Sequence, residues 1–148
     1  MATVIEKIRE ASQIAEATHN QVIAEIVEYF KQKFNSKEFE EYLVTKCTES
    51  NTAKDRQISW SVEFWGYHEG CSPTHFYSMG QGWRNPENPE GYESYFYKGI
   101  DLRNIQKAAG AQILQVTLDK LHELGFTTKV EDQESWLKYY HKVIIISW

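Results

Sequence analysis

The sequence predicts an α+β fold, a two-layer sandwich in which two main helices pack on one face of a mostly antiparallel sheet. Three observations predict it. Apolar residues recur at helical spacing in the first third of the chain and again after residue 101. Apolar and polar residues alternate strictly around residue 60, and a short apolar run, Val143–Ile146, has strand length. The 148 residues fit a single domain, 1–148, which can bury roughly 70% of its unfolded surface.

The first third is predicted to be helical. Its apolar positions form two groups, Val4, Ile5, Ile8, Ala11 and Ala15, then Val22, Ile23, Ile26, Val27, Phe30 and Phe34. Two interpretations remain open between the groups. Either Thr18 and Gln21 form a capping box that restarts the helix, or one long helix runs through. Asn35–Ser36 predicts the end of the helix, and Ser36 can cap a following turn.

The next stretch is ambiguous, because Phe39, Leu43 and Cys47 fit a helix whereas Tyr42 and Val44 fit a strand. We expect a short helical turn followed by a strand over residues 42–48. A polar loop is expected from Glu49 to Asp55.

The clearest strand is Ile58–Trp65, where apolar residues alternate with Ser59, Ser61 and Glu63. A neighbouring strand is predicted at His75–Met79. The segment Gly80–Gly91 carries three glycines and two prolines and is predicted to be a loop. A further short strand is expected over residues 92–98.

The second main helix is predicted to begin after Asp101, a good N-cap, and to end at Gly125–Phe126, which suits a C-terminal stop. Gly110 inside it suggests a close approach to another backbone, since glycine weakens a helix interior. Strands follow at Thr127–Glu131, before a turn at 132–135, and at Tyr139–Trp148, which is apolar on both faces and therefore expected in the sheet interior. The predicted core is Ile26, Phe30, Trp60, Val62, Phe64, Ile113, Val116, Leu121, Ile144 and Ile146.

Composition excludes several classes of function. The net charge is −5, and Lys and Arg are interleaved with Glu, so the basic face that nucleic-acid binding needs is not present in the sequence. The apolar runs are too short to span a membrane, and we expect no signal peptide at the start. Two cysteines do not form a disulfide framework. These features predict a cytoplasmic protein that interacts with neither membrane nor nucleic acid.

One cluster could support catalysis. His68, Cys71 and His75 fall within eight residues, a spacing that can contribute zinc ligands or activate a thiol nucleophile. A structural zinc site needs a fourth ligand, and the only other cysteine, Cys47, is distant in sequence. An enzyme that uses this cluster, with or without zinc, is therefore the alternative interpretation. Under the preferred interpretation, given next, we expect no bound metal or cofactor.

The preferred hypothesis rests on an unusual aromatic content, 14%, concentrated between residues 60 and 97. Trp83 beside Arg84 in a glycine-rich segment could stack a planar ligand and pair with its phosphate or carboxylate. The expected site residues are Trp83, Arg84, Tyr67, His68, His75, Tyr77 and Tyr92. The sequence therefore predicts a non-catalytic binding protein for a nucleotide-like ligand or a host protein, a profile typical of phage or mobile-element accessory proteins. An open strand or aromatic surface on so small a domain also predicts a two-fold homodimer.

Overall fold

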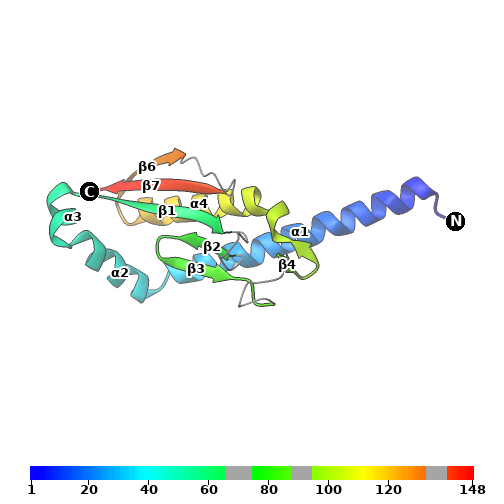
Figure 1. The fold of residues 1–148 in the computed structure, drawn as a ribbon, viewed down its shortest axis with the longest axis horizontal. Helices are drawn as coiled ribbons and strands as arrows, with labels where there is room; N and C mark the ends of the chain where they lie inside the picture. Colours follow the sequence, from blue (N-terminus) through cyan, green and yellow to red (C-terminus); the bar gives the residue numbers. More distant parts are fainter. Residues whose placement is uncertain (66–74, 88–94, 133–139) are drawn as a thin grey trace.

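The computed structural model describes residues 1–65, 75–87, 95–132 and 140–148. Its main feature is a five-stranded antiparallel sheet with strand order β3-β2-β1-β7-β6, with helices packed against it (Figure 1). This arrangement confirms the predicted α+β class. The helices are α1 (Val4–Phe34), α2 (Lys37–Cys47), α3 (Ser50–Asp55), a 3-10 turn η1 (Leu102–Asn104) and α4 (Gln106–Glu123). The strands are β1 (Gln57–Trp65), β2 (His75–Ser78), β3 (Gln81–Arg84), β4 (Phe96–Tyr97), β5 (Ile100–Asp101), β6 (Thr127–Asp132) and β7 (His141–Ser147).

The first helix is continuous, which decides between the two interpretations left open by the sequence. Thr18 does not cap a second helix, because its hydroxyl donates to the Ile14 carbonyl at 2.9 Å within an unbroken run. The capping box lies instead at the start of α1. Thr3 Oγ1 accepts from the Glu6 amide, and the Thr3 amide donates to the Glu6 carboxylate, both at 3.1 Å.

Two predictions between residues 42 and 55 are wrong. The expected strand at 42–48 is part of α2, and the expected polar loop contains α3. The reason is the i, i+4 spacing of Phe39 and Leu43, which are buried together on one face of α2. Ser36 starts this helix by accepting a hydrogen bond from the Phe39 amide at 3.1 Å. Local capping and burial therefore outweigh the strand preference of Tyr42 and Val44.

The sheet follows the predicted pattern near its centre. β1 pairs with β2 on one side and with β7 on the other, and β7 lies between β1 and β6 as expected for a strand that is apolar on both faces. Val62 and Phe64 point to the inner face and are buried, whereas Ser59, Ser61 and Glu63 lie on the outer face.

The predicted loop at Gly80–Gly91 is corrected in its first part, because Gln81–Arg84 forms strand β3. Met79 and Gly80 have φ angles of 49° and 79°. Two successive residues with positive φ form the tight turn that joins adjacent antiparallel strands, and the register Ser78↔Gln81 places this turn between β2 and β3. The strand signal was missed because a methionine rarely takes the first of these positions.

The core lies between the inner face of the sheet and the helices α1 and α4. Eight of the ten predicted core residues are buried, and the other two, Trp60 and Val116, are half-buried against the same core. Gly110 is explained by contact with a ring rather than with a backbone. A Cβ there would clash with the ring of Tyr140, so α4 carries glycine where Tyr140 packs against it.

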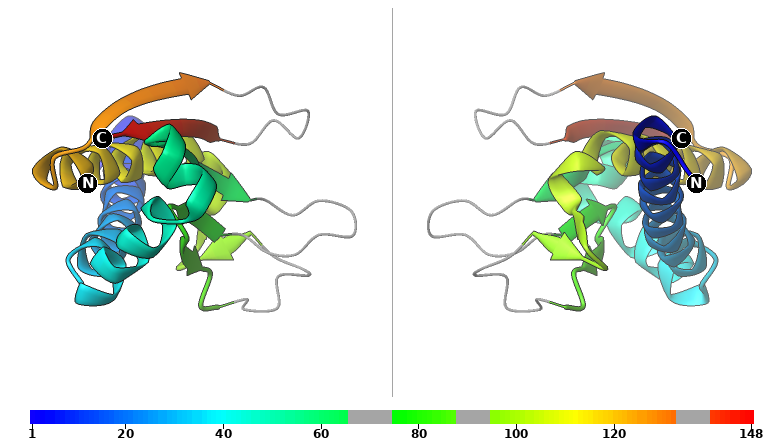
Figure 2. Two further views of the ribbon diagram at one scale, coloured as in Figure 1. Left: turned by 90° about the vertical axis from the view of Figure 1, so that its left-hand side faces the viewer. Right: turned by 90° about the vertical axis from the view of Figure 1, so that its right-hand side faces the viewer.

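The first half of α1 extends beyond the rest of the domain. Residues 1–17 are all exposed, and the first buried position of the helix is Val22. Figure 1 shows this half reaching away from the sheet toward the N-terminus, and the right view of Figure 2 shows it projecting toward the viewer. Among the helices described, none is long and apolar enough to cross a membrane.

Candidate functional site

The structure changes the role of Trp83, the main residue of the predicted recognition loop. Trp83 lies on the inner face of β3 and is only 5% exposed. Its ring packs against Phe76 and edge-on against Tyr97, with centroids 6.1 and 5.4 Å apart. Little of this ring is therefore open to a stacked ligand.

Other predicted residues do come together. His75, Tyr77 and Arg84 line a pocket of about 260 Å³ at β2 and β3, together with Gly80, Gly82 and Trp83. His75 and Arg84 are paired across the two strands on the outer face. The His75 and Tyr77 rings meet edge to face at 4.5 Å, and Tyr77 lies over Gly82, where a Cβ would come within 2.9 Å of the ring. We call this the hairpin pocket.

Three predicted site residues, Tyr67, His68 and Tyr92, lie outside the residues that the structure describes, as does Cys71. The His68–Cys71–His75 cluster is therefore described only at His75, which is buried on β2. Within residues 1–65, 75–87, 95–132 and 140–148, no group of three or more His, Cys, Asp or Glu side chains is placed to hold a metal ion.

A polar group on the outer face of the sheet resembles part of a catalytic triad but has a different geometry. His141 Nε2 lies 3.6 Å from the Glu63 carboxylate and 3.4 Å from the Ser61 hydroxyl. In a serine hydrolase the acid and the nucleophile contact opposite ring nitrogens, so that the imidazole can pass a proton between them. Here both of these contacts involve the same nitrogen, so among the described residues they link β1 to β7 and differ from the relay of a triad.

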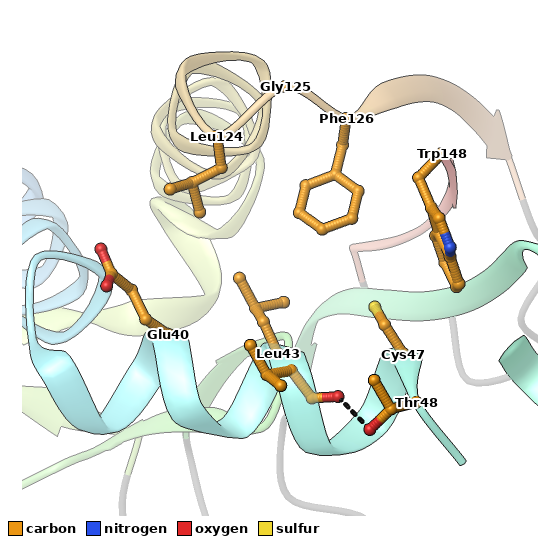
Figure 3. Close-up of a pocket in the computed structure, with 9 residues that line it drawn as sticks. Glu40, Leu43, Cys47, Thr48, Leu124, Gly125, Phe126 and Trp148 are labelled. Atoms are coloured by element: carbon orange, nitrogen blue, oxygen red, sulfur yellow. Dashed lines mark hydrogen bonds between the residues drawn. The ribbon is translucent and has the colours of Figure 1, made fainter.

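A larger pocket lies between α2 and the turn that joins α4 to β6. Its volume is about 480 Å³. Figure 3 shows Leu124 and Phe126 facing α2, and Trp148 facing Cys47. The lining residues are Glu40, Leu43, Val44, Cys47, Thr48, Leu124, Gly125, Phe126 and Trp148. We call this the apolar pocket.

The turn that forms one wall of the apolar pocket is fixed by local sequence. Gly125 has a φ of 96°, and its amide donates to the His122 carbonyl at 3.0 Å, while the Phe126 amide donates to the Leu121 carbonyl at 3.0 Å. These two bonds form a Schellman motif, which confirms the predicted helix stop. The motif reverses the chain so that Leu124 and Phe126 face the pocket from either side of the glycine. Phe126 then meets Trp148 edge-on at 6.1 Å.

The opposite wall is the face of α2 that carries Glu40, Val44 and Cys47 at helical spacing. Val44 is 63% exposed although it is β-branched and apolar. The Thr48 hydroxyl donates to the Val44 carbonyl at 2.6 Å, so its proton is already used in a hydrogen bond within the helix end. The pocket surface therefore consists of apolar side chains with one carboxylate, Glu40, and one thiol.

The described lining of the apolar pocket is poorly suited to activating a nucleophile or to holding an anion. Burial raises the pKa of the Cys47 thiol above its ordinary value, so the thiol is protonated near neutral pH. Among the nine described residues that line the pocket, there is no histidine to activate that thiol and no lysine or arginine to hold an anion. An unactivated thiol in apolar surroundings is inert.

The apolar pocket was not predicted from sequence, because its walls come from segments about eighty residues apart. Two signals pointed to its parts. The Gly125–Phe126 stop fixed one wall, and the spacing of Leu43 and Cys47 indicated a helix for the other, but nothing in the sequence placed the two walls together.

No protein-family model, curated protein or solved structure matches this chain.

Proposed function

We propose that this protein is a binding protein whose apolar pocket holds an uncharged, planar, apolar ligand. The observation that carries the proposal is the pocket itself. Its volume of about 480 Å³ falls within the range of roughly 300–1,000 Å³ typical of small-molecule sites. Its walls present Val44, Leu124 and Trp148, which are 63%, 36% and 42% exposed. Apolar side chains gathered around a concave surface are typical of recognition sites.

The charge of the lining selects the ligand chemistry. Glu40 contributes the one carboxylate side chain among the described residues that line the pocket, and a carboxylate repels anions. This disfavours the planar anion suggested by Trp83 and Arg84 in the sequence and favours a neutral ring system. The faces offered by Phe126 and Trp148, at 86° to each other, suit a flat ligand that stacks on one ring and meets the edge of the other.

Binding is favoured over catalysis by the state of Cys47. Covalent catalysis needs a thiolate activated by a neighbouring base or cation, whereas burial raises the pKa of this thiol. The side chain thus contributes a polarisable apolar surface to the pocket.

The hairpin pocket supports a second candidate function, binding of a small nucleotide-like anion. The observation in its favour is that His75, Tyr77 and Arg84 gather around one cavity. A guanidinium beside an aromatic ring suits a planar ligand that carries phosphate or carboxylate. Its smaller volume, about 260 Å³, and the burial of Trp83 make it the weaker candidate.

One titration tests the first proposal with a closely matched control. We expect the neutral dye N-phenyl-1-naphthylamine to bind saturably, and Val44→Asp to weaken its binding at least about tenfold, because a second carboxylate would enter the pocket. Thr45→Asp is the control. It adds the same charge one residue further along α2, outside the pocket lining. The two variants also match in their effect on the helix, because the new aspartate at position 44 would follow Glu40, and the one at position 45 would follow Glu41, by four residues. Equal dye binding by both variants would contradict the apolar-pocket proposal.

The same titration repeated with adenosine monophosphate distinguishes the second candidate. Quenching of tryptophan fluorescence by the nucleotide that is lost in Arg84→Ala, but kept in Val44→Asp, would assign binding to the hairpin pocket. Quenching that is unchanged in Arg84→Ala would reject that assignment.

A further inference from the structure

The projecting half of α1, residues 4–17, exposes large apolar side chains at one end of the molecule. Val4, Ile5, Ile8 and Ile14 are 72%, 54%, 55% and 61% exposed. Figure 1 shows this half and the C-terminus, beside which the apolar pocket lies, at opposite ends of the molecule. An exposed helix of this length is marginal in water unless it packs against something.

The apolar residues follow the spacing of a helix pair. Val4, Ile8, Ala11 and Ala15 are separated by four, three and four residues, which is the a/d repeat by which one helix packs along another. The positions on the opposite side of the helix are polar, including Glu6, Arg9, Glu10, Gln13 and Glu16. The projecting half therefore has one packing stripe and one solvent-facing side.

The order of side-chain sizes along this stripe makes it complementary to an antiparallel second copy of itself. The large residues, Val4 and Ile8, come first, and the small residues, Ala11 and Ala15, follow. If a second copy runs antiparallel, Val4 lies opposite Ala15 of that copy and Ile8 opposite Ala11, so that every layer combines a large with a small side chain and has nearly the same width. A parallel pair would stack large on large at one end and alanine on alanine at the other, and the helices could not stay in contact throughout.

We propose that the projecting half of α1 binds a second copy of this chain, forming an antiparallel helix pair at the centre of a two-fold dimer. Such an interface is self-complementary, as two-fold symmetry requires. Along the stripe, the pairing places residues whose numbers sum to 19 opposite each other. It overlaps residues 4–15 of both helices, all of which lie before the first buried position of α1, Val22.

The residues that flank the stripe also fit this pairing. On one side of the stripe, Ile5 lies opposite Ser12 of the second copy. On the other side, Lys7 lies opposite Ile14 of the second copy, and the aliphatic part of the lysine side chain can cover this isoleucine. No like charges meet across the helices at these positions. The same half carries three acidic and two basic side chains, Glu6, Glu10 and Glu16 against Lys7 and Arg9, so its charge hardly opposes association.

The edge of the sheet at β6 is less suited to self-association. Lys129, Glu131 and Asp132 occupy this edge strand and are exposed, and charged edge strands disfavour edge-to-edge pairing. The homodimer predicted from an open strand or aromatic surface thus finds a better basis in α1.

The mass in solution tests the pairing. The chain has a mass of 17.4 kDa, and light scattering should give twice that value, about 35 kDa, at roughly 100 μM, where a dimer with micromolar affinity is formed. Ile8→Glu should convert the protein to a 17.4 kDa monomer whose near-ultraviolet circular dichroism is unchanged, because the aromatic side chains packed in the domain core lie outside the projecting half. Gln13→Glu, on the solvent-facing side, should remain a dimer. A wild-type monomer at this concentration, or an Ile8→Glu variant that still forms dimers, would overturn the proposal.

A distance measurement tests the direction of the helices. In a background with Cys47→Ser and Cys71→Ser, a spin label on Asn20→Cys lies just beyond the overlap. In the antiparallel pair the two labelled positions are separated by twenty-one residues along the axis, about 31 Å at 1.5 Å per residue. In a parallel pair they would be separated by little more than the distance between helix axes, about 8–10 Å, plus the label arms. A distance distribution centred below about 20 Å would reject the antiparallel arrangement.

Discussion

The two halves of α1 have similar apolar residues at similar spacing but opposite surroundings. Ile8 is 55% exposed and Ile26 is fully buried, although both lie on the same unbroken helix. The second half is covered by α4 and β3, whereas the described residues of this chain leave the first half uncovered. The comparison teaches that periodicity identifies the apolar face of a helix but not the surface that covers it.

The second half is also fixed by polar contacts. The Tyr29 hydroxyl donates to the Gly82 carbonyl at 2.6 Å and ties α1 to β3. Tyr97 donates to Glu25 at 2.5 Å, and Lys98 reaches the same carboxylate at 3.0 Å. The hydrogen bond from Tyr97 and the nearby Lys98 ammonium lower the pKa of Glu25, although its burial opposes this. Long-range contacts of this kind distinguish the buried half from the projecting half.

The largest expected effect is a loss of stability at Phe30. Its ring is fully buried and contacts Tyr29 and Phe34, so Phe30→Ala should lower the free energy of unfolding by about 3–5 kcal/mol. Ile8→Ala in the projecting half is the comparison, and in dilute, monomeric protein it should change that free energy by less than about 0.5 kcal/mol. Urea denaturation measures both. Similar losses of unfolding free energy in the two variants would show that the projecting half is packed as tightly as the buried half.

A smaller effect is expected at Tyr29. Tyr29→Phe removes the hydroxyl and leaves the Gly82 carbonyl without this partner, which should cost about 1 kcal/mol. Burial raises the pKa of Tyr29, so its contribution to stability is complete below the unfolded pKa of about 10 and is lost as the pH rises through the higher folded value. Denaturation at a series of pH values should show the wild type approaching the variant only above about pH 10. Parallel curves over the whole range would contradict this role of the hydroxyl.

The sequence predicted the fold well where a single periodic pattern decides burial. The alternation from Ile58 to Phe64 fixed the inner face of β1, and the apolar run at Val143–Ile146 fixed an interior strand. It failed where two patterns compete, as in α2, and where a turn depends on an unusual residue, as at Met79. Strand preference and loop composition are weaker influences than capping and burial at these positions.

The candidate sites were less predictable than the fold. Trp83 was proposed as a stacking surface because it lies in a glycine-rich segment, whereas on β3 its ring is turned into the core. Arg84, next in sequence, points to the other face and is exposed, because side chains alternate along a strand. The apolar pocket depends on contact between α2, the end of α4 and the end of β7. Such a long-range arrangement leaves no pattern in any one segment.

The smallest expected effect on global stability, but a clear local one, concerns the first turn of α1. Thr3→Ala removes the hydroxyl that accepts from the Glu6 amide, and loss of such a cap costs about 1 kcal/mol of helix stability. In the Ile8→Glu background, in which the proposed pairing cannot support the helix, this cost should remain within the projecting half. Hydrogen exchange at residues 4–10 should then become about fivefold faster. Exchange at residues 22–34 and the urea midpoint should stay unchanged, because the buried half is held by α4 and β3 rather than by the helix start. A lower urea midpoint, or faster exchange in the buried half, would mean that the two halves unfold as one cooperative unit. The projecting half would then contribute to the global stability of the domain although it is exposed.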